Sequence, residues 1–220
     1  ESLDPWAKWR PGSFVKFRVR TLIGSSSGAP EFETTNSLVQ VTEKEVTVRT
    51  SIRGGGLDRQ NETTSPLGAS FPVASPERTE GGSEMLALDG KEIPCAIWRF
   101  TGEGHESTAW HAEGIAIPLR LKTKSNQEGG MMSGEIESDL RVTSRREDRV
   151  IGGRTLSCVK LEGPIRILSK GMGEAKGTIT VWMSLEIPGG TAGMVTDITL
   201  VSNKMKIRLE QDAVEFDARR

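Results

Sequence analysis

The chemistry open to this chain is limited first by its two histidines, His105 and His111. They are six positions apart, about 20 Å along an extended strand, so they cannot share a metal ion unless the chain folds back. His111 and Glu113 would lie about 6.6 Å apart on one strand face, next to Trp110. An acid–base or metal pair is one interpretation. The exposed polar face of a strand is the other, and we favour it.

A second candidate for chemistry is the acidic series Glu135, Glu137 and Asp139. A hard cation such as Ca²⁺ binds several oxygens at once. On one strand, however, these carboxylates would be spread over more than about 10 Å, and no loop closes around an ion. The series therefore predicts a solvated strand face, and the chain also contains no H-E-x-x-H or C-x-x-C motif. We expect no enzyme activity, no metal site and no cofactor.

The sequence contains an internal repeat. Residues 90–95 (GKEIPC) return 63 positions later as residues 153–158 (GRTLSC). Each copy is followed by a Trp and an aliphatic–Pro pair: Trp110 and Ile117-Pro118 in the first, Trp182 and Ile187-Pro188 in the second. Residues 138–142 and 203–207 also correspond. The repeat predicts a duplicated strand framework, and its prolines predict bends or edges, because Pro cannot donate to a central ladder.

The two cysteines, Cys95 and Cys158, occupy the same place in the two copies. They should therefore lie on equivalent strands, several strands apart. Neighbouring strands are about 4.8 Å apart, whereas a disulfide needs Cα atoms within about 7 Å. Only closure or face-to-face packing of the sheet would allow a disulfide. We expect free, buried thiols, with the disulfide as the alternative.

Alternation of apolar and polar residues predicts strands along most of the chain. The series Val15, Phe17, Val19, Thr21 and Ile23 alternates with Lys16, Arg18 and Arg20, and residues 38–52 read as a hairpin with its turn at 43–45. Further strands are predicted at 84–89, 92–100, 106–112, 115–123, 134–144, 147–151, 154–161, 164–169, 175–186, 193–201 and 204–210. No window of a dozen residues has a helical period. The predicted fold class is all-β with few or no helices, a curved antiparallel sheet or half-barrel built from an internal duplication.

Residues 57–83 differ in composition from the rest of the chain, because Pro, Ser, Thr and Gly dominate there. Such a segment predicts a linker or a long crossover. The chain then divides into N-terminal strands (1–56), the crossover or linker (57–83), a first repeat unit (84–145) and a second repeat unit (146–217). We expect residues 84–217 to form one continuous domain with residues 1–56.

Charge and hydropathy restrict the partners. The 29 basic and 30 acidic residues nearly cancel, so the chain lacks the overall basic character of nucleic-acid-binding proteins, and we expect no such partner. No run approaches the roughly 18 to 20 apolar residues of a transmembrane helix. The chain starts at Glu1 without a Met, as either a mature protein without its export signal or a trimmed domain would. Helix-poor proteins that are rich in Gly, Ser and Thr and contain duplicated units are common outside the cytoplasm. We therefore expect an extracytoplasmic protein, periplasmic or secreted.

The repeated tryptophans are the remaining candidates for a functional site. They could line an apolar cavity on the concave face of the sheet, together with neighbouring aromatic and aliphatic side chains. The predicted lining is Trp98, Phe100, Trp110, Ile115, Ile117, Trp182, Met183, Leu185 and Met194. The alternative is that these side chains fill the core, as large aromatic residues mostly do.

These segments carry a family resemblance. Residues 182–190 (WMSLEIPGG), after a Gly-Arg-x-Leu-x-Cys strand, and the opening 11–15 (PGSFV) look like patterns in uncharacterised exported bacterial β-rich proteins. More distantly, the meander over residues 10–210 resembles the lipoprotein-carrier (LolA/LolB-like) superfamily, whose members curl an antiparallel sheet around a lipid. This chain departs from the carriers in lacking clear helices to plug the barrel. The resemblance implies a binding protein and no catalytic residue.

The leading functional hypothesis is therefore a non-enzymatic exported protein that binds an apolar or lipid-like ligand on the concave face of its sheet. A structural or protein-interaction module without a small ligand, using the 57–83 segment and an exposed edge, is the alternative. A hydrolase that uses His111 and Glu113 is the second alternative.

Overall fold

The computed structural model describes residues 5–24, 31–66, 77–102, 104–127, 134–171 and 173–219. Within these ranges it contains strands and turns but no helix, which confirms the predicted all-β class. The strands are β1 (Phe14–Ile23), β2 (Glu31–Val41), β3 (Glu45–Gly54), β4 (Leu57–Pro66), β5 (Glu77–Leu88), β6 (Lys91–Gly102), β7 (His105–Ala112), β8 (Arg120–Gln127), β9 (Gly134–Ile151), β10 (Arg154–Ser169), β11 (Gly173–Met183), β12 (Thr191–Leu200) and β13 (Lys206–Asp217).

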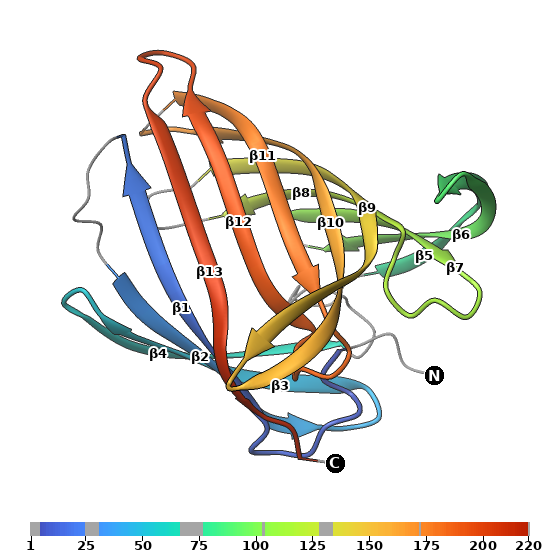
Figure 1. Cartoon of the computed structure of the whole chain (residues 1–220), viewed down its shortest axis with the longest axis horizontal. Helices are drawn as coiled ribbons and strands as arrows, with labels where there is room; N and C mark the ends of the chain where they lie inside the picture. The colour runs from blue at the N-terminus through green and yellow to red at the C-terminus, as the bar shows by residue number, and fades with distance from the viewer. Residues whose placement is uncertain are drawn as a thin grey trace.

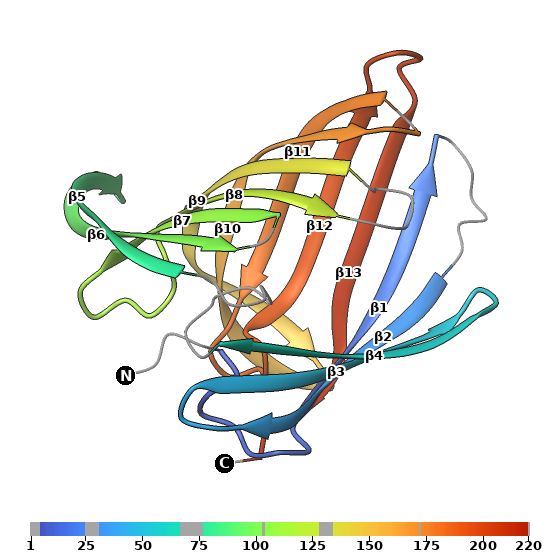
Figure 2. The same cartoon turned by 180° about the vertical axis from the view of Figure 1, so that it is seen from behind.

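All thirteen described strands belong to one antiparallel sheet, in the order β4-β3-β2-β1-β13-β12-β11-β10-β9-β8-β7-β6-β5. Consecutive strands are neighbours throughout, except that β4 and β5 lie at opposite edges while β1 pairs with β13. Figures 1 and 2 show that the sheet is strongly curved. Its two edge strands do not pair with each other, so the sheet is open. The predicted curved antiparallel sheet is therefore confirmed.

Several predicted strands join into longer ones. The segments 134–144 and 147–151 are parts of β9, and 154–161 and 164–169 are parts of β10. The predicted boundary between the repeat units, at residues 145–146, thus falls inside β9.

The 57–83 segment is not a linker over its whole length, and this prediction needs correction. Residues 57–66 form β4, and residues 77–83 begin β5; residues 67–76 lie outside the described ranges. Polar cross-strand pairs hold β4 to β3, with Thr47 Oγ1 2.9 Å from Thr64 Oγ1 and Arg49 Nε 2.8 Å from Glu62 Oε1. An edge strand held by such pairs needs no apolar alternation, so its sequence looks like that of a loop.

The two repeat copies occupy equivalent strands, β6–β7 and β10–β11. Each cysteine lies opposite a glutamate of the preceding strand, Cys95 opposite Glu84 and Cys158 opposite Glu147. Each repeat tryptophan donates its Nε1 hydrogen to that same glutamate, over 2.6 Å from Trp110 and 2.7 Å from Trp182. The duplication thus preserves a specific hydrogen bond between strands.

The correspondence of residues 138–142 with 203–207 is wrong. Residues 138–142 lie inside β9, whereas residues 203–205 belong to the turn before β13. The similarity of the two segments is local and does not extend to their place in the sheet.

The core is divided into several clusters along the curved sheet. The central cluster is formed by Phe100, Ala109, Ile117, Leu121, Leu140 and Leu161. A second cluster joins the first strands to the distant end of the β9–β10 hairpin: Val15, Phe17, Ile151, Leu156, Cys158, Ile187, Ala192 and Ala213. Because β9 also contacts β13, which is not its neighbour in the sheet order, the hairpin end packs back against the strands around the chain termini.

Candidate functional site

The nine residues predicted to line a cavity are not gathered around one space. Trp98, Phe100, Ile117 and Met183 belong to the central cluster or pack against it. Trp110 and Ile115 belong to a neighbouring cluster with Cys95, and Trp182 packs against the hairpin-end cluster. Leu185 is 43% exposed. Met194, on β12, pairs with Val181 of the neighbouring strand β11.

Trp110 and Trp182 lie on the face of the sheet opposite to the central cluster. Trp110 follows Ala109 in β7, and Trp182 pairs with Lys160, the residue before Leu161 in β10. Because successive residues of a strand point to opposite faces, both indoles share the face that carries charged side chains. They therefore cannot line one cavity together with Phe100 and Leu161.

Each of these indoles is also covered by an arginine. The Arg120 guanidinium lies 4.7 Å from the Trp110 ring centroid, and that of Arg149 lies 4.2 Å from the Trp182 ring. Asp139 and Asp212 hold these arginines in ion pairs of 2.7 and 2.6 Å. Such cation–π contacts stabilise the sheet, and they occupy a ring face that a ligand would need.

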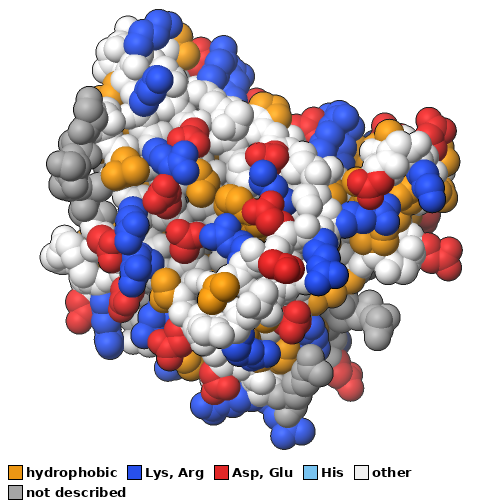
Figure 3. Space-filling view, viewed as in Figure 1, with side chains coloured by type: hydrophobic (Ala, Val, Ile, Leu, Met, Phe, Trp, Pro, Cys, Tyr) orange, Lys and Arg blue, Asp and Glu red, His pale blue; other side chains and the backbone are white. Residues whose placement is uncertain are grey.

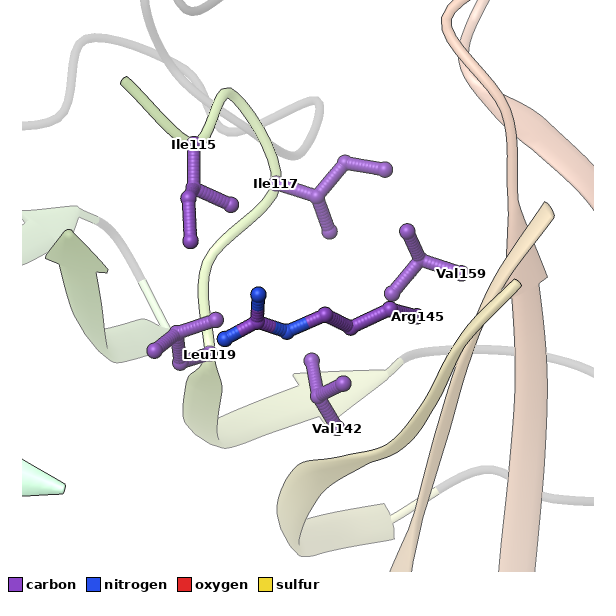
Figure 4. Close-up of a pocket in the computed structure, with 6 residues that line it drawn as sticks. All are labelled: Ile115, Ile117, Leu119, Val142, Arg145 and Val159. Carbon is purple, nitrogen blue, oxygen red and sulfur yellow. The ribbon is translucent and has the colours of Figure 1, made fainter. Parts of the chain in front are cut away.

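An apolar pocket lies where the loop between β7 and β8 meets β9 and β10 (Figure 4). Its volume is about 210 Å³, and its lining is Ile115, Ile117, Leu119, Val142, Arg145 and Val159. Two of these residues, Ile115 and Ile117, were among the nine predicted from the sequence. Leu119 lies in the same loop, whereas Val142, Arg145 and Val159 come from parts of the chain that the sequence did not connect with it.

The β7–β8 loop is held against the sheet by backbone hydrogen bonds. Leu119 N–H donates to the Trp110 carbonyl over 2.8 Å, and Val142 N–H donates to the Leu119 carbonyl over 2.9 Å. Gly114 turns the chain with φ near +73°, a conformation that glycine adopts without steric cost. Pro118 offers no N–H for a ladder, so residues 115–119 form a loop and not the predicted start of a strand.

The opposite wall of the pocket is shaped by irregular pairing of β9 with β10. The register shifts twice between Cys158 and Leu161, which leaves extra residues on β9. Ser144 Oγ closes this bulge, since it accepts from Arg146 N–H over 3.3 Å and donates to the Arg146 carbonyl over 3.0 Å. A β-bulge changes the direction of the side chains beside it. Here it is accompanied by an Arg145 side chain that lines the pocket.

Among the described residues that line the pocket, Arg145 alone is charged. Figure 4 shows its side chain extending between Ile117 and Val142, with the guanidinium toward Leu119. Its Nε forms an ion pair of 3.0 Å with Asp89, in the turn between β5 and β6. The two side chains are 48% and 63% exposed, and a pair so exposed stabilises the fold by about 0–1 kcal/mol. The pair can therefore open at little cost.

A second hollow of about 430 Å³ lies beside the turn between β12 and β13. Charged residues contribute to its lining, and two of them, Asp197 and Arg208, form an ion pair of 2.8 Å. The smaller pocket is thus the better candidate for an apolar ligand.

The structure places His111 and Glu113, the acid–base pair considered from the sequence, in different surroundings. His111 is buried in β7, whereas Glu113 is exposed in the turn that follows. Burial lowers the pKa of His105, at the start of β7.

The acidic series on β9 is engaged in ion pairs across the sheet. Lys124 pairs with Glu135 and Glu137 over 3.0 and 3.1 Å, and Arg120 pairs with Asp139. Among the residues that the structure describes, no three His, Cys, Asp or Glu side chains are grouped as a metal site would require.

Cys95 and Cys158 are buried free thiols, as predicted. Burial raises the pKa of both. A raised pKa keeps a thiol protonated near neutral pH, which disfavours reaction as a nucleophile.

Acidic and basic side chains alternate over the face of the molecule seen in Figure 3. In the described part of the chain there is no helix of the length and apolar character that crossing a membrane would demand.

Comparison with known proteins gives only weak similarities. No protein-family model and no curated protein matches the sequence. Among solved structures, the chain is similar to the hypothetical lipoprotein YmcC from Escherichia coli K12, with 9% identity and a TM-score of 0.32 over 94% of this chain and 90% of that one.

Two matches involve MucB. The Pseudomonas aeruginosa MucA/MucB complex aligns with 9% identity and a TM-score of 0.22, over 99% of this chain and 97% of that one. MucB in complex with MucA(peri) gives 10% identity and a TM-score of 0.20, over 97% and 95%. These values amount to a distant fold resemblance, and they carry no argument about function.

Proposed function

We propose that this protein is a non-enzymatic binding protein that holds an apolar, lipid-like ligand in the pocket between the β7–β8 loop and the β9 bulge. The observation that carries the proposal is the composition of this pocket, five aliphatic side chains and one arginine. Binding sites for small molecules are typically apolar hollows with a few polar groups that fix orientation. An extracytoplasmic location remains part of the proposal, on the grounds of composition given above.

The size of the pocket limits what it can hold. Its volume of about 210 Å³ is below the roughly 300–1,000 Å³ of sites that enclose a drug-sized ligand. The pocket therefore fits one end of an acyl chain, and the rest of a longer ligand would lie outside it.

The proposal is tested with the neutral hydrophobic dye N-phenyl-1-naphthylamine. Val159→Phe fills the pocket with a larger apolar side chain, whereas Val201→Phe makes the same change at an exposed turn residue. We expect saturable dye fluorescence for the wild-type protein and Val201→Phe, and at least a tenfold weaker affinity for Val159→Phe. Equal affinity in both variants, with both folded by circular dichroism, would refute the site.

A protein-interaction module is the second candidate, because β4 and β5 are edge strands of an open sheet. Exposed edges can pair with a strand of another protein. Both edges, however, carry features that discourage such pairing. Charged Asp58, Arg59 and Glu62 lie along β4, which ends at Pro66, and the pairing of β5 is interrupted between Glu80 and Ser83. We therefore rank ligand binding first.

A further inference from the structure

We infer that the ligand of this pocket is a single-chain amphiphile with a carboxylate head group, such as a medium-chain fatty acid, and that its head group replaces Asp89 on Arg145. This inference rests on the proposed function, because it names the ligand class for the same pocket. It starts from the combination of aliphatic walls with a single cation.

The guanidinium of Arg145 selects the charge of the head group. The planar fork of N–H donors on a guanidinium matches the two oxygens of a carboxylate. Among the described residues the pocket lining contains no acidic side chain, and the nearby Asp89 carboxylate is already paired with Arg145. A cationic head group at the guanidinium would therefore be repelled. An anionic head group gains a charge-assisted hydrogen bond, about twice as strong as a neutral one.

The ion pair with Asp89 shows that Arg145 binds a carboxylate in this position. The Asp89 carboxylate lies 3.0 Å from the Arg145 Nε, in the position of an anion beside the apolar walls. Since both partners are largely exposed, exchange of this carboxylate for that of a ligand costs little. The new ion pair would be accompanied by transfer of the ligand's chain from water to the pocket, which favours the exchange.

The volume of the pocket indicates the length of the buried chain. A volume of about 210 Å³ corresponds to about seven waters at roughly 30 Å³ each. The pocket therefore takes only part of a medium-length chain, and we choose the ten-carbon acid, decanoate, as a probe whose chain is long enough to fill it.

The experiment compares decanoate with decanol, which has the same chain and no charge, by displacement of N-phenyl-1-naphthylamine at pH 8. We expect decanoate to bind the wild-type protein about tenfold more tightly than decanol, which corresponds to about 1.4 kcal/mol. Arg145→Gln should remove this difference, because it weakens the binding of decanoate at least fivefold more than that of decanol. Asp89→Asn should strengthen decanoate severalfold, because the competing carboxylate is gone.

Asp89→Asn is a conservative change at this position. Asp89 has φ near +53°, and Asn is one of the few residues that adopt the left-handed region readily. The turn should therefore keep its geometry in this variant, and circular dichroism of all variants provides the control for folding.

Equal affinities for decanoate and decanol, unaffected by Arg145→Gln, would overturn the carboxylate assignment while the proposed function stands. Failure of both compounds to displace the dye from a folded wild-type protein would count against the proposed function itself. Decyl phosphate is the third arm, and tighter binding of the phosphate than of decanoate would also overturn the assignment of a carboxylate.

Discussion

At the scale of single residues, the structure shows why the two repeat tryptophans, the most conspicuous side chains of the sequence, are not part of the pocket lining. Trp110 and Trp182 each hydrogen-bond to a glutamate and lie under an arginine. A buried indole needs such a partner for its N–H. The repeated Trp therefore marks a repeated structural contact, while the pocket depends on smaller aliphatic residues.

The pair Arg120–Asp139 is a bidentate charge-assisted contact on this face. The Arg120 Nε and Nη2 donate to the two Asp139 carboxylate oxygens over 2.8 and 2.7 Å. Hydrogen bonding by Arg120 is the main cause that lowers the pKa of Asp139 below its ordinary value. A carboxylate with a lowered pKa stabilises the fold above the pKa that it has in the unfolded chain.

We predict that Asp139→Asn lowers the free energy of unfolding by about 1–3 kcal/mol at pH 7, the range for hydrogen bonds to charged groups. The difference from the wild type should be constant down to about pH 5 and should shrink below about pH 4, near the pKa of an unfolded Asp. The difference in stability should vanish once the pH is below the lowered pKa that Asp139 has in the folded protein. Urea unfolding of both proteins at a series of pH values measures it. A difference that persists undiminished at pH 2 would contradict the charge explanation.

At the scale of strands, two glycines permit the close approach of neighbouring backbones. A Cβ added at Gly163 would overlap with the Asp139 carbonyl, and one added at Gly177 would overlap with the Asp197 carbonyl. Both glycines lie inside strands, where glycine is otherwise unfavourable and often marks close approach of another backbone. These positions therefore need glycine for steric reasons.

We predict that Gly177→Ala lowers the free energy of unfolding by about 1–3 kcal/mol, the usual cost of overpacking. Gly171→Ala is the matched control, since a Cβ there meets no atom within 4 Å. Thermal or urea unfolding followed by circular dichroism compares the two variants. Equal stability of both variants would show that the strands adjust without cost.

The sequence predicts strands correctly where one face of the strand is buried and the other is exposed to solvent. Residues 15–20 alternate between apolar and basic side chains, and β1 covers Phe14–Ile23. Alternation fails for β4, which is polar on both faces, and it cannot reveal that β9 continues through a bulge near Ser144. The apolar–polar pattern of a segment indicates which of its side chains are buried. Whether a strand lies at the edge of the sheet, and in which register it pairs, depends on strands that are distant in the sequence.

The pocket was predictable only in part for the same reason. Ile115 and Ile117 were found because they follow a repeat tryptophan in the sequence. Val142, Arg145 and Val159 join them only through the bulged pairing of β9 with β10. Nothing in the residues around Arg145 distinguishes it from the adjacent Arg146, which forms an exposed ion pair with Asp148.

At the scale of the whole molecule, the sheet joins the beginning and the end of the described chain. β1 pairs with β13 over its full length, and Phe17 of β1 belongs to the same buried cluster as Leu156 and Ala213. The N-terminal strands β1–β4 thus belong to the same sheet as the repeat strands, and β1 also shares a buried cluster with them.

We predict that Phe17→Ala destabilises the whole molecule by about 3–5 kcal/mol, the usual cost of removing a buried Phe side chain. Phe17 is 2% exposed, and its cluster includes residues of β9 and β10. Tryptophan fluorescence and far-ultraviolet circular dichroism should therefore report the same urea midpoint, shifted equally by the substitution. Two separate transitions, with only one of them shifted, would mean that β1–β4 unfold independently.

The pairing of β1 with β13 has a consequence for synthesis. The ribosome produces β1 before any other described strand, but one of its two neighbours in the sheet, β13, emerges after all the others. At roughly 5–20 residues per second, β1 waits many seconds with one side of its backbone unpaired. Such delayed, long-range pairing makes folding slow and exposes the nascent chain to aggregation. A chaperone that covers β1 during translation should therefore increase the yield of folded protein.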